Sequence, residues 1–197
     1  VRGDGDGWVV SHTGTPYWGR HGAAGLLLRA PQPDGTPAVL LQHRAPWSHQ
    51  GGTWALPGGA RDSHETAEQA AVREAHEEAG LPAEVVHVRA TVVTAEVSGP
   101  GGAVWTYTTV VADAPHLLDT VPNRESSELR WVAEDEVIGL PLHPGFADSW
   151  DSLRITSTLS PDDHDDCLQP LPHTVEITSG VFAWCRAEIS RQQPAPH

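Results

Sequence analysis

Three glutamates stand close together within residues 58–81: Glu74, Glu77 and Glu78. Residues three and four apart share one face of a helix, so the three carboxylates would crowd one side. Like charges at this spacing repel each other, and these lie near the negative C-terminal end of the predicted helix. A site that binds a hard divalent cation through oxygen atoms would explain that cost. The spacing therefore predicts a Mg²⁺ site, with Mn²⁺ as a substitute.

The helix that must carry these carboxylates is well marked in the sequence. Ala, Glu, Gln and Arg, which favour helices, dominate the stretch that begins near Glu65. Asp62 or Ser63 is a candidate cap for its start, and the run Gly80-Leu81-Pro82 ends it. A tight Pro57-Gly58-Gly59 turn precedes it. Loop and helix together would therefore present the carboxylates at one place.

The same segment resembles the Nudix box, which has the pattern G-x5-E-x7-R-E-U-x-E-E-x-G-U, with U a bulky aliphatic residue. All seven fixed positions of the pattern match, and they are Gly59, Glu65, Arg73, Glu74, Glu77, Glu78 and Gly80. Ala75 is smaller than the first aliphatic position asks for, and Leu81 fits the second. The box covers residues 59–81, and the wider resemblance runs over about residues 20–155.

The resemblance implies a fold and an activity. The expected fold is α/β, a Nudix-type α/β/α sandwich with a mixed β-sheet. The expected reaction is Mg²⁺-dependent hydrolysis of a diphosphate linkage in a nucleoside diphosphate derivative, and a MutT-type (deoxy)nucleoside triphosphate pyrophosphohydrolase is the preferred reading. Two alternatives stay open: a hydrolase of ADP-ribose or another diphosphate, and a Nudix sensor domain that binds nucleotides without cleaving them.

The resemblance also assigns roles to the residues of the box. Glu74 and Glu78 look like the principal metal ligands and Glu77 like a third. The turn is expected to add a backbone carbonyl, and the matching residue is Gly58. Arg73 resembles the residue that orients the carboxylates through charge-assisted hydrogen bonds.

Residues outside the box complete the expected site. The family often adds a carboxylate from a later loop as base or extra ligand; Glu125 is preferred here over Glu128, although both could be ordinary surface residues. The candidates for substrate binding are Arg44, Trp47, His49, Trp54, Trp105 and Tyr107. Their aromatic side chains could equally belong to the core.

Composition narrows the class of partner. The chain has 26 acidic and 12 basic residues, a formal net charge of −14. This balance argues against binding nucleic-acid polymers or anionic membranes. A polyanionic small molecule would be repelled too, unless cations bridge it to the protein. The sequence leaves a homodimer open.

The two cysteines, Cys167 and Cys185, have no C-x-x-C spacing. They are expected to be reduced thiols in a soluble, cytoplasmic protein.

The expected organisation is one domain with appendages. Residues 1–22 read as an irregular N-terminal arm, residues 23–158 as the Nudix hydrolase domain, and residues 159–197 as a C-terminal extension with a frayed end. Short apolar or alternating runs predict strands, and a helix is expected to close the domain. The strands are expected at 23–29, 39–44, 84–97, 104–112 and 129–132, and the closing helix at 143–158.

Overall fold

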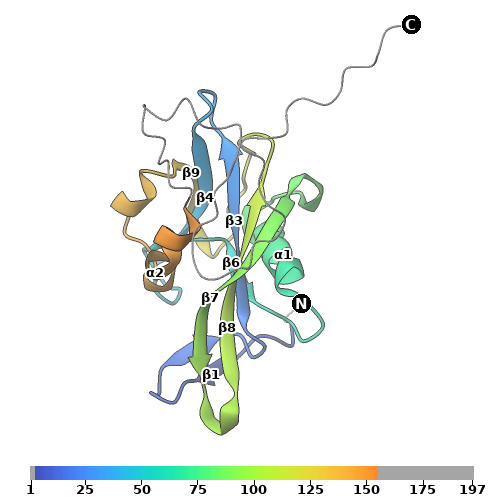
Figure 1. The fold of residues 1–197 in the computed structure, drawn as a ribbon, viewed down its shortest axis with the longest axis vertical. Helices are drawn as coiled ribbons and strands as arrows, with labels where there is room; N and C mark the ends of the chain where they lie inside the picture. The colour runs from blue at the N-terminus through green and yellow to red at the C-terminus, as the bar shows by residue number, and fades with distance from the viewer. Residues whose placement is uncertain (1–2, 155–197) are drawn as a thin grey trace, which may run out of the picture. The chain divides into compact units, whose positions relative to one another are not determined.

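The computed structural model describes residues 3–154, and a mixed sheet of seven strands organises them (Figure 1). The strands are β3 (Ala23–Pro31), β4 (Pro37–Arg44), β5 (Trp54–Ala55), β6 (Gly58–Ala60), β7 (His87–Ser98), β8 (Val104–Asp113) and β9 (Ser126–Ala133). Their order is β5-β4-β3-β8-β7, with β6 also paired to β3 and β9 to β4. Only the pairing of β3 with β8 is parallel within this described sheet. The predicted α/β class with a mixed sheet is confirmed.

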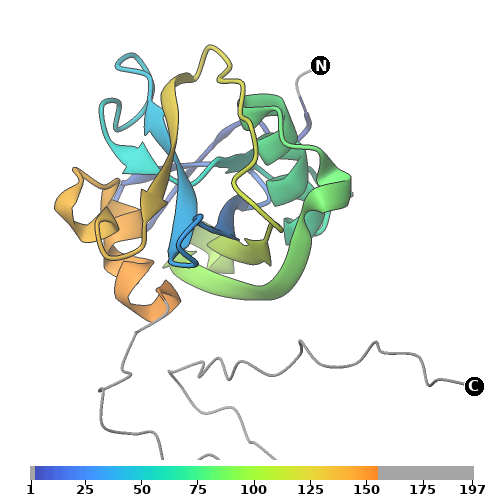
Figure 2. The same cartoon turned by 90° about the horizontal axis from the view of Figure 1, so that it is seen from above.

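The long outer strand β7 is bent. Its antiparallel register with β8 shifts between Val88 and Ala90 and again between Val93 and Ala95. Each shift is a bulge-like irregularity, which bends a strand and increases its local twist. Figure 2 shows the resulting curve of β7 around the end of the sheet. The sequence predicts the strand but not these breaks in its pairing.

Helix α1 (Ala67–Ala79) lies against the sheet (Figures 1 and 2). Its N-terminus is closed by a capping box: the Thr66 hydroxyl accepts from the Gln69 N–H, and the Gln69 side chain accepts from the Thr66 N–H. Thr66 therefore takes the role that the sequence suggests for Asp62 or Ser63. Gly80 ends the helix in the left-handed conformation, at φ 68°.

A stripe of alanines lets α1 approach the sheet closely. Ala70, Ala71, Ala75 and Ala79 are all fully or almost fully buried. They pack in one cluster with apolar side chains of β3, β4 and β8. The small Ala75, which departs from the bulky residue of the box pattern, belongs to this contact. Glu78 is buried on this same side of α1, so the close packing also fixes its distance from the Pro57-Gly58-Gly59 turn.

The remaining helices are short. They are η1 (Ala83–Val85), η2 (Pro100–Gly102), η3 (Val137–Gly139) and α2 (Pro144–Leu153). Contacts divide the chain into the units Val1–Ser149 and Trp150–His197, and α2 crosses this boundary. The predicted closing helix is thus present, and its described part ends at Leu153. Within residues 3–154 no helix combines the length and apolar character needed to cross a bilayer.

The N-terminal segment differs from its prediction as an irregular arm. Strands β1 (Trp8–Val10) and β2 (Pro16–Trp18) pair antiparallel as a separate two-stranded sheet. Trp8 lies opposite Trp18 in this pairing, and their rings meet edge to face at 5.1 Å. A three-residue strand is too short to show the alternation from which strands are read in a sequence.

Some predictions lie outside the described residues. These are the C-terminal extension at 159–197, the state of Cys167 and Cys185, and the last part of the closing helix. The domain boundaries at residues 22/23 and 158/159 also stay predictions.

The capping box gives a test of how α1 is held. Thr66→Ala removes the acceptor for the Gln69 N–H, so we expect the free energy of unfolding to fall by about 1 kcal/mol. Thr66→Ser keeps the hydroxyl and should stay close to wild type. Urea denaturation followed by circular dichroism measures both variants. Equal stability of Thr66→Ala and wild type would show that this cap does not hold the helix.

Candidate active site

The three carboxylates of α1 differ in burial. The Glu78 residue is 4% exposed, the Glu74 side chain 17% and the Glu77 side chain 57%. An Oε2 atom of Glu78 accepts a hydrogen bond from the backbone N–H of Gly58 at 2.8 Å. The Gly58 turn and the last turns of α1 therefore meet at a buried carboxylate, while Glu77 stands at the solvent edge.

Gly59 is required by the position of Glu74. A Cβ atom at residue 59 would lie 2.6 Å from the carboxyl carbon of Glu74. The box glycine thus leaves the space that the glutamate side chain occupies.

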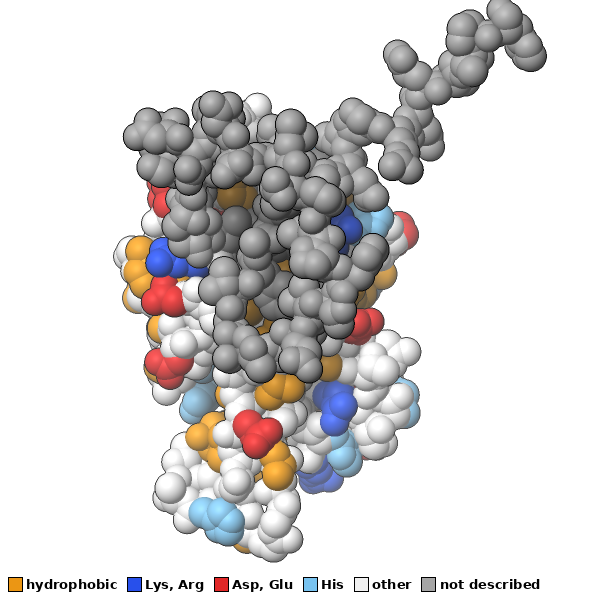
Figure 3. All heavy atoms as spheres, viewed as in Figure 1, with side chains coloured by type: hydrophobic (Ala, Val, Ile, Leu, Met, Phe, Trp, Pro, Cys, Tyr) orange, Lys and Arg blue, Asp and Glu red, His pale blue; other side chains and the backbone are white. Residues whose placement is uncertain are grey.

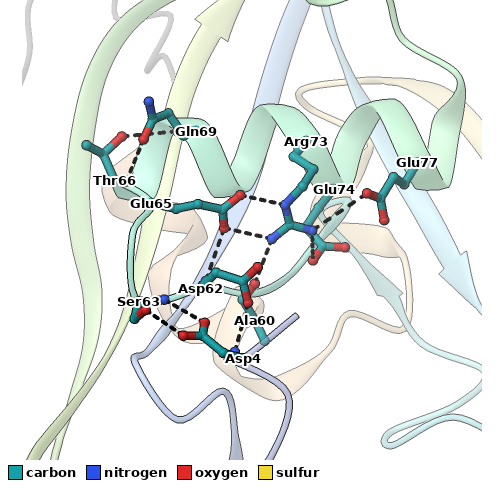
Figure 4. A network of polar contacts seen from close by, with 11 residues as sticks. Asp4, Ala60, Asp62, Ser63, Glu65, Thr66, Gln69, Arg73, Glu74 and Glu77 are labelled. Carbon is teal, nitrogen blue, oxygen red and sulfur yellow. Dashed lines mark hydrogen bonds and ion pairs between the residues drawn. The ribbon is translucent and has the colours of Figure 1, made fainter. Parts of the chain in front are cut away.

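Arg73 ties the loop to the helix (Figure 4). Its guanidinium donates to Glu65 at 2.6 Å, to Glu74 at 2.8 Å and to the carbonyl of Ala60 at 3.0 Å. A longer ion pair of 3.9 Å reaches Glu77. The bonds to Glu65 are the main cause of the raised pKa of Arg73, and they lower the pKa of Glu65. Arg73 thus contacts both Glu65 and Glu74, and its role in orienting Glu74 stays a prediction.

Glu78 has a strongly raised pKa, at about 8. Burial is the main cause, because it disfavours the ionised form, and the negative charges of Glu74 and Glu125 add to it. The Gly58 N–H and the Gln42 side chain act in the opposite direction. Burial also raises the pKa of Glu74, against the effect of Arg73. This region of the protein therefore has an excess of negative charge with few internal cations.

The donor set suits a hard divalent cation. Carboxylate and carbonyl oxygens are the ligands that Mg²⁺ and Mn²⁺ take in proteins. A positive charge beside Glu78, which is buried, and Glu74, which is partly buried, would stabilise their ionised forms. Glu74, Glu78 and the Gly58 turn are the groups that fit this role. Glu77 lies near enough for its charge to raise the pKa of Glu74.

The structure separates the two candidates for the outer carboxylate. The charge of Glu125 contributes to the raised pKa of both Glu74 and Glu78, so Glu125 lies near them. Glu128 is instead engaged by Arg130, whose Nε donates to it at 2.8 Å. The geometry favours the preference for Glu125, although its role stays a prediction.

Three of the predicted substrate-binding residues, Arg44, His49 and Tyr107, are linked by contacts or charge effects, and Glu78 also acts on Tyr107. The Nε of Arg44 donates to the carbonyl of His49 at 3.0 Å. The pKa of Tyr107 is raised, first by burial and then by the charge of Glu78, while Arg44 opposes this rise. The Tyr107 hydroxyl lies over Gly25, where a Cβ atom would come within 2.1 Å of it. Because Gly25 has no side chain, the space above β3 is free for the Tyr107 hydroxyl.

The three tryptophan candidates, Trp47, Trp54 and Trp105, differ in their contacts and exposure. Trp54 is 5% exposed and stacks on His43 at 4.8 Å, with the Arg130 guanidinium 4.7 Å from its ring centre. This is the packing role that the sequence analysis left open for such residues. Trp47 is 70% exposed. The indole N–H of Trp105 donates to the carbonyl of Trp18 at 3.1 Å, which ties β8 to the N-terminal hairpin.

Gln42 is a site residue that the sequence analysis missed. It is 1% exposed, its Nε2 donates to the hydroxyl of Ser126 at 2.8 Å, and its side chain also favours the ionised form of Glu78. Its Oε1 is buried without a hydrogen-bond partner among the described residues. The sequence gives little signal for it, because Gln42 ends the apolar run of β4 and is followed by the polar residues His43 and Arg44. Only its burial, which the structure shows, calls for a specific partner.

A second acidic group lies at the loop before α1. Asp4, Asp62 and His64 bring one potential ligand atom each within 4.8 Å of one another. Both aspartates already have partners, because Asp4 accepts from the N–H and hydroxyl of Ser63 and Asp62 from the N–H of Gly5 (Figure 4). These bonds fasten the N-terminal segment to the box loop. Asp4 and His64 are exposed, whereas Glu78 of the box is buried.

The comparisons with known proteins identify the class. The family model of the NUDIX domain matches residues 19–154. The chain therefore belongs to the Nudix family, and it is a hydrolase of phosphoric anhydrides.

Individual relatives support the same assignment. A Mycobacterium tuberculosis protein named "Putative 8-oxo-dGTP diphosphatase 3" is 70% identical over 197 residues, which is 100% of this chain and 91% of that protein. The crystal structure of RenU, a Nudix hydrolase from M. smegmatis, is 77% identical, covers 76% of this chain and 93% of its own, and superposes with a TM-score of 0.75. A C. elegans Ap4A hydrolase complex at 22% identity covers 66% of this chain and 91% of its own with a TM-score of 0.52, and it shares the fold.

The raised pKa of Glu78 predicts how stability depends on pH. Without metal, this carboxyl keeps its proton up to about pH 8 in the folded state but ionises near 4.5 in the unfolded chain. Between these values the folded state binds more protons, so its stability falls as pH rises through this window. We expect the thermal midpoint in EDTA to fall between pH 5 and pH 8. The slope should be smaller in Glu78→Gln, and an unchanged slope would contradict the assignment.

Proposed function

We propose that this Nudix hydrolase cleaves a diphosphate linkage of a (deoxy)nucleoside triphosphate in the presence of Mg²⁺ or Mn²⁺. Water attacks phosphorus, the phosphoanhydride P–O bond breaks, and a nucleoside monophosphate and pyrophosphate leave. The observation that carries the proposal is the pair of neighbouring carboxylates with raised pKa values: Glu78, which is buried against the Gly58 N–H, and Glu74, which is partly buried.

The residues of the chain divide the work. Glu74, Glu78 and the carbonyl of Gly58 would hold the cation, with Glu77 at the exposed edge. A cation bound there would offset charge on the phosphate oxygens and lower the pKa of the attacking water. Arg73 donates to Glu74 and would hold it in position. Glu125, whose charge acts on Glu74, would accept a proton.

The relatives support the nucleotide class. The 70% identity to the M. tuberculosis protein extends over the whole chain, and the name of that protein specifies 8-oxo-dGTP. We therefore propose an oxidised or unmodified deoxyguanosine triphosphate as the preferred substrate. Arg44 and Glu78 both act on the pKa of Tyr107, so Arg44 is a nearby cationic side chain that suits a phosphate group.

Conversion of the glutamates to glutamines tests the site. Glu74→Gln and Glu78→Gln remove a charge without changing volume, and we expect turnover of dGTP to fall at least about 100-fold because direct ligands matter more than their supporting residues. Glu68→Gln, on the exposed first turn of α1, is the matched control and should keep its turnover. Normal turnover in both site variants would contradict the proposed site.

A substrate panel tests the proposed chemistry. We expect 8-oxo-dGTP and dGTP to be hydrolysed to monophosphate and pyrophosphate, resolved by ion-exchange chromatography, at rates above those for ADP-ribose and diadenosine polyphosphates. A strong preference for ADP-ribose would replace the proposed substrate. Nucleotide binding with no turnover would favour the sensor reading.

A further inference from the structure

The N-terminal hairpin brings an exposed tryptophan to the loop that follows β4. The Trp8 ring meets the His49 ring at 5.8 Å with an interplanar angle of 67°, while Trp18 supports it from the other strand. Trp8 is 52% exposed. Figure 3 shows apolar side chains reaching the surface at the end of the molecule where Figure 1 places β1. Residue 8 precedes the segment that matches the family model, so no shared feature of the family requires an aromatic ring here.

A second histidine, His143, lies next to these rings, and Trp8, His49 and His143 together are called the aromatic wall. The protonation of the His143 ring follows from its surroundings. The ring of His143 lies 6.5 Å from that of His49. Burial, followed by the positive charges of Arg44 and His49, lowers the pKa of His143 to about 4, so its ring is neutral at pH 7. The N–H of Gly145 donates to Nδ1 of His143, which leaves the proton on Nε2. His143 therefore offers an N–H donor to a ligand.

The wall adjoins the carboxylates through backbone contacts. Arg44 donates to the carbonyl of His49, and the next residue, Ala45, donates its N–H to the carbonyl of Glu125 at 2.9 Å. Glu125 in turn lies near Glu74 and Glu78. These contacts connect the loop of His49, through Arg44 and Ala45, to Glu125, whose charge acts on Glu74 and Glu78. A nucleotide that reaches from the metal ligands to the rings would pass Arg44, which suits its phosphates.

We propose that Trp8, His49 and His143 form the subsite that binds the nucleobase, which makes the hairpin β1–β2 a specificity element of the enzyme. The inference rests on the proposed function, because it names the base-binding part of the same site. A flat aromatic base stacks on the Trp8 indole, and Nε2–H of His143 donates to a carbonyl oxygen or ring nitrogen at the edge of the base. The ligand class is therefore an aromatic base with hydrogen-bond acceptors on its edge.

Binding of dGMP, measured by calorimetry without metal, tests the subsite independently of turnover. Trp8→Ala removes one base–aromatic stack, and we expect the affinity for dGMP to fall at least about fivefold. His49→Ala should weaken dGMP binding in the same direction. Trp8→Phe keeps a ring and should restore most of the affinity. Val10→Ala, on the same strand and half exposed, is the matched control and should bind as wild type does.

Tripolyphosphate separates the base from the phosphate contacts. Its inhibition constant against dGTP hydrolysis should be unchanged in Trp8→Ala, whereas the KM for dGTP should rise by the same factor as the dissociation constant of dGMP. Equal loss of tripolyphosphate and dGMP binding would overturn the inference, since it would show a general disturbance of the site.

Two further outcomes would also overturn it. Wild-type protein that does not bind dGMP would remove the base subsite, while hydrolysis of other diphosphates could still stand. Unchanged dGMP binding in Trp8→Ala, together with a change in sedimentation velocity, would assign Trp8 to contact between copies of the chain.

Discussion

Burial of neighbouring glutamates at the end of α1 is the constraint on which the rest of the site depends. Ionised carboxylates are costly to remove from water unless cations or several N–H groups compensate them. Glu78 accepts a hydrogen bond from the Gly58 N–H, and the Gln42 side chain also favours its ionised form. Arg73 donates to both Glu65 and Glu74. Compensation inside the protein is therefore incomplete, and we propose a divalent cation as the partner of these carboxylates.

The fold is arranged to keep these groups together despite their repulsion. The alanine stripe of α1 seats the helix on the sheet, and the two glycines of the turn admit the backbone and the Glu74 side chain at close range. Gly25 in β3, which has no side chain, likewise leaves room for the Tyr107 hydroxyl. Small residues thus set the distances at this site, while the charged ones supply its chemistry.

Sequence alone predicts the parts of this site whose contacts are local. Glu74, Glu77 and Glu78 lie within two turns of one helix, so their spacing fixes their relation, and Gly80 marks the end. Gln42 and the Trp8–His49 contact depend on segments that meet only after folding, and no periodicity shows them. Thr66 was missed as the cap because Asp62 and Ser63 compete as equally good caps, and their side chains and backbone bond elsewhere.

Anomalous scattering from crystals soaked in Mn²⁺ at pH 7.5 tests the central claim directly. The account predicts a peak within coordination distance of the carboxylates of Glu74 and Glu78 and near the carbonyl of Gly58. A peak confined to Asp4, Asp62 and His64, or none at α1 while dGTP is still hydrolysed, would contradict it.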